Sequence, residues 1–280
     1  MQFVDSHAHL DRLNLTPYEG SLEKWLAACN EMKVLRHLCV GISLNDFPKV
    51  LAIATDYPEI YASVGVHPNE HCVDPESEPT LELLLQHSSQ HKVVAIGETG
   101  LDYYRLEEGG DPQLQQQRFR VHIRAAVAAN KPLIVHCREA KEDTLRILRE
   151  EGAERVGGVM HCFVEDLPTA EAAMALGFYI SFSGIVTFKS AEALQRVATE
   201  IPSERLLIET DSPYLAPVPY RGKSNYPQYV VFVAEALAQL RQERVEEIAK
   251  NSWNNFSDLF KLPRVLQSNL KSTVEHSESG

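Results

Sequence analysis

Two histidines, His7 and His9, stand two positions apart in the stretch Asp5-Ser6-His7-Ala8-His9 near the start of the chain. In an extended strand, residues i and i+2 project from the same face. Both imidazoles can therefore reach one metal ion, and imidazole is a good ligand for Zn, Mn and Fe. Taken alone, this spacing is also compatible with two ordinary polar residues at the end of a strand.

Four further residues of ligand type come directly after other short apolar runs of the sequence. These residues are Glu98, His136, His161 and Asp211. The carboxyl ends of parallel strands converge at the mouth of an α/β barrel, so we expect all six side chains to meet there. Four imidazoles and two carboxylates are too many for one tetrahedral ion that keeps an open position. They suit two ions about 3.5 to 4 Å apart, joined by one carboxylate and by a water or hydroxide.

The order of the strands suggests how the ligands divide. Glu98 follows the fourth strand, between the first-strand pair and the later histidines, so we expect it to bridge the two ions. His7, His9 and Asp211 would hold the first ion, and His136 and His161 the second. Asp211 is also placed to accept a proton from the metal-bound water.

A fifth histidine, His67, ends the third apolar run in Gly65-Val66-His67-Pro68 and would face the same cavity. It could orient a substrate phosphate or protonate a leaving group. A structural histidine that forms an ordinary hydrogen bond at the end of a strand is the alternative.

Basic and aromatic residues also fall on loops that would surround this mouth. Arg138, Lys189, Arg221 and Lys223 could clamp an anionic substrate, or could belong to the solvated surface. Loop tyrosines can stack the bases of a single strand or pack against the rim of the barrel, and the four concerned are Tyr103, Tyr104, Tyr214 and Tyr220. Cys137 and Cys162 each follow a candidate ligand, and strand alternation is expected to turn them into the core.

The elements that must position these residues alternate between apolar runs and helical patterns, as in a parallel α/β fold. Eight strands are predicted at residues 2–4, 38–41, 61–66, 93–97, 133–135, 158–160, 178–181 and 206–208. Helices are predicted at residues 21–32, 112–130, 141–150 and 192–199, followed by two closing helices at 228–241 and 245–254. Eight βα units predict a TIM-type (β/α)₈ barrel.

Composition limits the class of protein. The 280 residues are 44% hydrophobic and carry a net charge of −12, which does not fit a passive nucleic-acid coat. Five scattered cysteines do not suggest a disulfide framework, and neither a secretory signal nor a membrane span is recognisable, so a cytoplasmic protein is expected. The motifs of serine hydrolases, P-loop nucleotidases and dinucleotide-binding proteins are absent from the sequence.

Several motifs, taken together, resemble those of the TatD family of metal-dependent deoxyribonucleases. They are Val4-Asp5-Ser6-His7-Ala8-His9-Leu10-Asp11, Gly65-Val66-His67-Pro68, Gly97-Glu98-Thr99-Gly100-Leu101-Asp102-Tyr103, residues 132–138, His161-Cys162-Phe163 and Glu209-Thr210-Asp211-Ser212-Pro213-Tyr214. The resemblance covers about residues 3–262 and implies a distorted, amidohydrolase-like TIM barrel with two divalent ions, Mg or Mn. It also implies hydrolysis of phosphodiester bonds in DNA, with 3′–5′ exonuclease action on single strands.

We therefore predict one catalytic domain over residues 1–263 and a polar, disordered tail over residues 264–280. The expected partner is DNA, preferably single-stranded, with no membrane association and no obligate protein partner. Because fold and metals do not fix the substrate, a hydrolase of a small amide, lactone or phosphoester is the alternative. A barrel that binds a partner and has lost its catalytic role is a third possibility.

Overall fold

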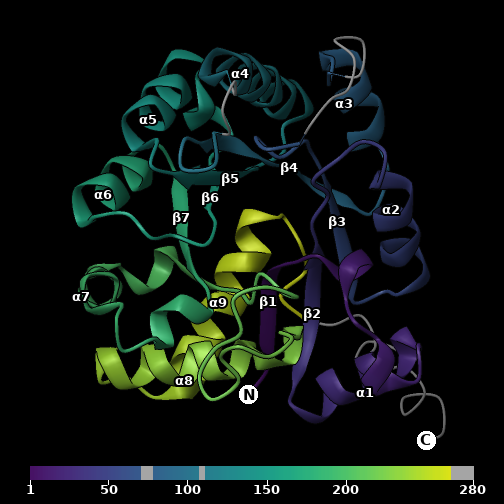
Figure 1. Ribbon diagram of the computed structural model, residues 1–280, viewed down its shortest axis with the longest axis vertical. Helices are drawn as coiled ribbons and strands as arrows, with labels where there is room; N and C mark the ends of the chain where they lie inside the picture. The colour runs from purple at the N-terminus through teal and green to yellow at the C-terminus, as the bar shows by residue number, and fades with distance from the viewer. Residues whose placement is uncertain (71–77, 107–110, 266–280) are drawn as a thin grey trace, which may run out of the picture.

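The computed structural model describes residues 1–70, 78–106 and 111–265, and it has eight parallel strands that pair in chain order (Figure 1). The strands are β1 (Phe3–Ala8), β2 (Val34–Cys39), β3 (Ile60–Val64), β4 (Val93–Asp102), β5 (Leu133–Arg138), β6 (Gly158–Met160), β7 (Phe178–Phe182) and β8 (Leu206–Ile208). Strands of this kind are buried on both faces, which explains the unbroken apolar runs such as Leu133-Ile134-Val135. The predicted α/β barrel is confirmed.

Nine α-helices lie in the described part of the chain, and most of them surround the strands (Figure 1). They are α1 (Leu22–Glu31), α2 (Phe47–Asp56), α3 (Leu81–Ser88), α4 (Pro112–Ala129), α5 (Lys141–Glu150), α6 (Leu167–Ala175), α7 (Glu192–Glu200), α8 (Val230–Arg241) and α9 (Val245–Leu259). The predicted N-cap of α1 is confirmed, because the Ser21 hydroxyl accepts a hydrogen bond from the backbone N–H of Lys24 at 3.2 Å. None of the described helices is long and apolar enough to span a membrane.

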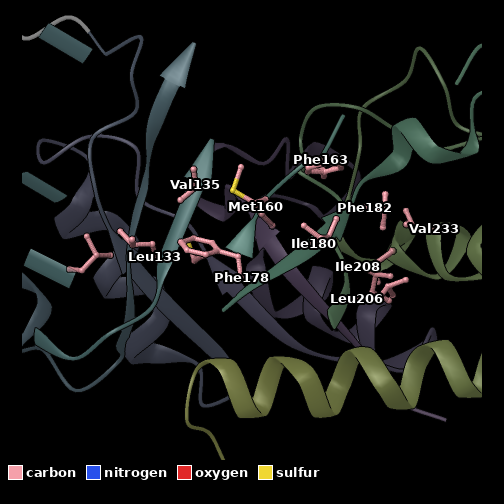
Figure 2. Close-up of a cluster of buried hydrophobic side chains, with 14 of the residues drawn as sticks. Leu133, Val135, Met160, Phe163, Phe178, Ile180, Phe182, Leu206, Ile208 and Val233 are labelled. Carbon is pink, nitrogen blue, oxygen red and sulfur yellow. The ribbon is translucent and has the colours of Figure 1, made fainter. Parts of the chain in front are cut away.

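Apolar side chains form two core clusters. The larger one includes residues that strands and helices contribute together, and Figure 2 shows part of it, with Leu133 of β5, Phe178 of β7 and Val233 of α8 among the labelled side chains. The smaller cluster joins strand residues such as Val4 and Ile134 to α9 and the residues that follow it. Because these strand residues precede the candidate ligands along their strands, α9 closes the amino-terminal end of the barrel and leaves the carboxyl end for the site.

Some predicted strand boundaries were wrong. His7, Glu98 and His136 do not follow their strands but lie within them, because the backbone pairing continues further than the apolar runs. In particular, Gly100 of β4 still pairs with His136 of β5. The second strand begins at Val34 rather than residue 38, since its polar residues are buried and hide the start of the run.

Arg36 explains why a buried strand can contain a charged residue. Its guanidinium lies 4.3 Å from the ring centroid of Trp253 and donates to the hydroxyl of Ser257 at 2.9 Å. The carbonyl of Arg264, the first residue of the predicted tail, accepts from the indole N–H of Trp253 at 2.7 Å. Residues 266–280 of the predicted tail lie outside the described residues.

The first and last strands are joined mainly through backbone beyond β8. Ala8 forms an isolated bridge with Ser212, and the N–H of Asp211 donates to the carbonyl of His7 at 3.0 Å. The N–H of His9 in turn donates to the carbonyl of Ser212 at 2.8 Å. This closure places Asp211 beside the two histidines of the first strand.

Candidate metal centre

The carboxylate of Glu98 lies at the centre of the candidate site, with one oxygen facing each of two groups of histidines. Its Oε2 lies 3.3 Å from Nε2 of His7 and 3.8 Å from Nε2 of His9. Its Oε1 lies 2.9 Å from Nε2 of His161 and 3.2 Å from Nδ1 of His136. A carboxylate that presents one oxygen to each group has the geometry that a bridge between two ions requires.

Asp211 completes the first group. Its Oδ1 lies 3.6 Å from Nε2 of His7 and 3.3 Å from Nε2 of His9. Asp211 has the left-handed backbone conformation, with φ 55°, which is uncommon for a residue with a side chain. These three residues bring their nitrogen and oxygen atoms within 4.8 Å of one another, close enough to hold one metal ion.

The far ring nitrogens of three histidines face hydrogen-bond acceptors, and this determines which nitrogen carries the proton. Nδ1 of His9 lies 3.2 Å from the carbonyl of Val40, Nε2 of His136 lies 3.2 Å from Oδ2 of Asp102, and Nδ1 of His161 lies 3.3 Å from Oε1 of Glu209. Carbonyl and carboxylate oxygens only accept, so the facing nitrogen is the donor. In each neutral ring the other nitrogen, which faces Glu98, then offers a lone pair to a metal.

His67 has the opposite arrangement. Its Nε2 lies 3.4 Å from Oε1 of Glu98, so distance alone also groups it with Glu98 and His136 as a possible ligand. Its Nδ1, however, accepts a hydrogen bond from the backbone N–H of Asn69 at 3.1 Å. A neutral ring that accepts at Nδ1 must carry its hydrogen on Nε2, so His67 points a donor into the site rather than a lone pair.

Burial and charge set the protonation of the site. Burial alone would raise the pKa of Glu98, but its contacts with His161 and His136 outweigh burial and hold that pKa well below the usual value. Burial lowers the pKa of His67 to about 3, and it also lowers the pKa of His7. Both rings are therefore neutral near pH 7, while the carboxylate stays ionised.

The buried ring of His7 lacks a hydrogen-bond partner among the described residues. Neither of its ring nitrogens makes a hydrogen bond to any described residue, although the side chain is fully buried. Buried polar atoms are normally satisfied, because an unmade hydrogen bond costs about 1 to 3 kcal/mol. A cation held by Nε2 would satisfy that nitrogen, so the donor set fits a divalent metal.

A cavity of about 630 Å³ opens above these groups. Of the residues expected at the mouth, it is lined by His9, His67, Glu98, His136, Arg138, His161, Asp211 and Tyr214. His7 lies buried beneath it, whereas Lys189, Arg221 and Lys223 are exposed and are not among its lining residues. The Arg221 guanidinium instead lies 4.3 Å from the ring centroid of Phe188.

Several residues of the site were not found by sequence reasoning. Asn69, Asp102 and Arg105 also line the cavity, and Glu209 is buried next to His161. Asp102 lies in the same short motif as Glu98, and Glu209 lies in the same short motif as Asp211. This proximity in the sequence could have pointed to both residues. The expected core position is confirmed for Cys137, which packs against the larger core cluster although it also reaches the cavity lining. The expectation was wrong for Cys162, which lines the cavity with its Sγ 3.2 Å from the Ser183 hydroxyl. At Cys162, φ is 43°, so the alternation assumed for a strand does not apply there.

Gly100 allows the fourth and fifth strands to come together at the site. Its φ of 139° is accessible to glycine, and it pairs with His136 across the sheet. A Cβ added at Gly100 would overlap the carbonyl oxygen of His136. The absence of a side chain at Gly100 therefore allows β5, which carries His136, to lie close to β4.

Comparisons with known proteins give a consistent result over nearly the whole chain. A family model described as TatD related DNase matches residues 4–261. The metal-dependent hydrolase YcfH of Escherichia coli strain K12 is 46% identical over 261 residues, which are 93% of this chain and 96% of YcfH. The metal-dependent hydrolase YabD of Bacillus subtilis strain 168 is 43% identical over 258 residues, covering 92% of this chain and 98% of YabD. The crystal structure of YjjV, a TatD homologue from Escherichia coli K12, is similar with a TM-score of 0.84 at 30% identity, and covers 93% of this chain and 98% of YjjV.

Proposed function

Because the chain belongs to the TatD family of metal-dependent hydrolases, we propose that it cleaves phosphodiester bonds in DNA with two divalent metal ions. The observation that carries the proposal is the placement of Glu98, whose two oxygens face separate groups of nitrogen ligands. Two-metal sites of this kind suit in-line displacement at phosphorus. The family model, described as a DNase, supports DNA as the substrate.

The ligands are assigned by the direction of their lone pairs. His7, His9 and Asp211 would hold one ion, His136 and His161 the other, and Glu98 would bridge them. When bound, such ions lower the pKa of a water and offset charge on phosphoryl oxygens. Four imidazoles favour Zn, Mn or Fe, whereas the family resemblance favours Mg or Mn.

Two residues of the cavity would act on the reacting groups. Asp211 is ionised, because its contact with His9 and the neighbouring histidines lower its pKa against the effect of burial. It can therefore accept a proton from the attacking water. His67 would donate from Nε2 to a phosphate oxygen, which makes it a substrate-orienting residue, since a neutral imidazole is a poor acid for the leaving group.

We propose that the substrate is an unpaired 3′ end, from which nucleotides are removed in the 3′–5′ direction. The test is hydrolysis of end-labelled single-stranded and duplex oligonucleotides by metal-stripped protein with Mg, Mn or Zn added back. A double variant with His136→Ala and Asp211→Ala serves as the control. We expect a metal-dependent ladder that disappears in the double variant and whose end label gives the polarity.

The same experiment distinguishes the nuclease from the alternative. If protein shown to hold two ions cleaves no oligonucleotide with any metal, the DNase proposal is wrong. The small-molecule hydrolase then becomes the better hypothesis, because the same ligands would serve an amide, a lactone or a small phosphoester.

A further inference from the structure

Two aromatic side chains of the described chain are exposed, and both lie near the mouth of the cavity. Tyr104 is 57% exposed and follows β4, and Tyr214 is 49% exposed and follows β8. Tyr214 lines the cavity, with its ring centroid 5.9 Å from that of His9. In a sheet with the order β1 to β8, strands four apart lie on opposite sides of the barrel. The two rings therefore flank the candidate centre from opposite sides.

The cation next to Tyr104 extends this surface. The Arg138 guanidinium lies 3.8 Å from the ring centroid of Tyr104, and Arg138 also lines the cavity. A guanidinium on one face of the ring leaves the tyrosine exposed on its remaining surface. Together they connect the exposed rim with the cavity that His136 lines.

Two arginines of the cavity have no carboxylate partner among the residues that the structure describes. They are Arg105 and Arg138, whereas surface arginines such as Arg120, Arg124 and Arg146 are paired with glutamate or aspartate. Unpaired guanidinium groups beside a candidate two-metal centre are suited to phosphate oxygens, which they can contact with two parallel hydrogen bonds. The local positive charge lies in a chain whose net charge is −12.

We propose that Tyr104 with Arg138 on one side, and Tyr214 on the other, stack unpaired nucleobases that flank the reacting phosphate, while Arg105 and Arg138 contact backbone phosphates. The inference rests on the proposed function and names the side chains that would hold its single-stranded substrate. Every base presents a π-face, so such a site accepts many sequences. Bases inside a duplex have both faces covered by their neighbours, so the site selects against duplex.

The binding experiment uses an oligonucleotide with 2-aminopurine near its 3′ end, mixed with the full-length protein in the presence of EDTA. Fluorescence of this base is quenched when it stacks, so the readout does not depend on bound metal. We expect quenching by wild-type protein and by Tyr104→Phe and Tyr214→Phe, which keep the ring. With 2-aminopurine placed on one side or the other of the reacting phosphate, Tyr104→Ala and Tyr214→Ala should each lose quenching at one of the two positions and bind about tenfold more weakly.

A second measurement distinguishes the loss of base stacking from a general defect in the variant protein. With Mn present, wild-type protein should show a raised KM for an oligonucleotide that carries an abasic site at the stacked position. An alanine variant should raise the KM for this oligonucleotide little further. Equal binding by the Ala and Phe variants would overturn the stacking proposal, while metal-dependent cleavage would leave the nuclease intact. Absence of DNA cleavage by the wild-type protein would overturn both.

Discussion

Oδ2 of Asp102 lies 3.2 Å from Nε2 of His136, on the opposite edge of the imidazole from Glu98. The same carboxylate accepts from the side-chain amide of Asn69 at 2.8 Å and from the backbone N–H of Arg105 at 3.0 Å. Burial would raise the pKa of Asp102, but its contact with His136 prevails and holds the pKa at about 2. An ionised, fixed carboxylate thus directs the Nδ1 lone pair of His136 into the candidate metal centre.

Asp102→Asn should weaken binding of the ion proposed at His136 and His161, because the amide has no charge and can present an N–H to His136. Loss of such an outer partner typically reduces metal affinity by about 10- to 100-fold. Competition with a fluorescent chelator measures the two affinities. Asp258→Asn, which removes an exposed carboxylate paired with Arg264, is the matched control. Unchanged affinity for both ions in Asp102→Asn would show that Asp102 does not orient His136.

His67 is predicted to act on the substrate rather than on a metal. His67→Ala should therefore keep two ions per chain, while kcat/KM on single-stranded DNA falls by about 100-fold, as is typical when a donor to the reacting group is removed. In contrast, His136→Ala should lose an ion. Elemental analysis of dialysed protein gives the stoichiometry of both variants. Loss of one ion from His67→Ala would mean that its tautomer has been assigned wrongly and that it is a ligand.

The salt dependence of DNA binding should be shallow. Two arginines without a carboxylate partner in the described part of the chain line the cavity and the net charge is −12, so few phosphates can be neutralised. For two contacts on a single strand, the slope of log K against log salt is expected to be about −1.4. Titration of a labelled oligonucleotide in EDTA at several salt concentrations measures it. A slope typical of six or more contacts would require a longer basic groove than the described surface provides.

The sequence predicted the arrangement of the barrel well, because parallel strands buried on both faces leave continuous apolar runs. It also predicted where the candidate ligands converge, since each lies near the carboxyl end of a strand. It did not indicate Asp102 or Glu209, whose roles depend on contacts 34 and 48 residues away with His136 and His161. Nor could it show which ring nitrogen of His67 carries the hydrogen, because that depends on the fold of the following loop.

Gly100→Ala should disrupt the site through the backbone. The added methyl would overlap the carbonyl of His136, so the two strands must separate. Gly222→Ala is the matched control, because Gly222 also has a positive φ, 84°, but a Cβ there has nothing within 4 Å. We expect about 1 kcal/mol of destabilisation for Gly222→Ala from its φ alone, and a larger loss for Gly100→Ala together with weaker metal binding. Urea unfolding and chelator competition test both, and equal effects of the two variants would contradict the steric explanation.

His122 makes the folded protein sensitive to mild acid. It is fully buried on α4, where its Nε2 accepts from the backbone N–H of Val66 at 3.0 Å and its Nδ1 faces the carbonyl of Arg118 at 2.8 Å. A proton on Nε2 would remove the only acceptor for the Val66 contact. Burial accordingly lowers the pKa of His122 from 6.5 to about 4.

Between those two pKa values the unfolded chain binds a proton that the folded chain does not, so stability is retained above pH 6.5 and declines as the pH falls toward 4. From pH 7 to pH 5 the loss due to His122 should be on the order of 2 kcal/mol. His122→Gln should be less stable at pH 7 but lose less on acidification. Urea unfolding of metal-free protein at pH 7, 6 and 5 measures the two slopes, with His91→Gln at an exposed position as control. Parallel slopes for wild-type protein and His122→Gln would show that another group causes the acid sensitivity.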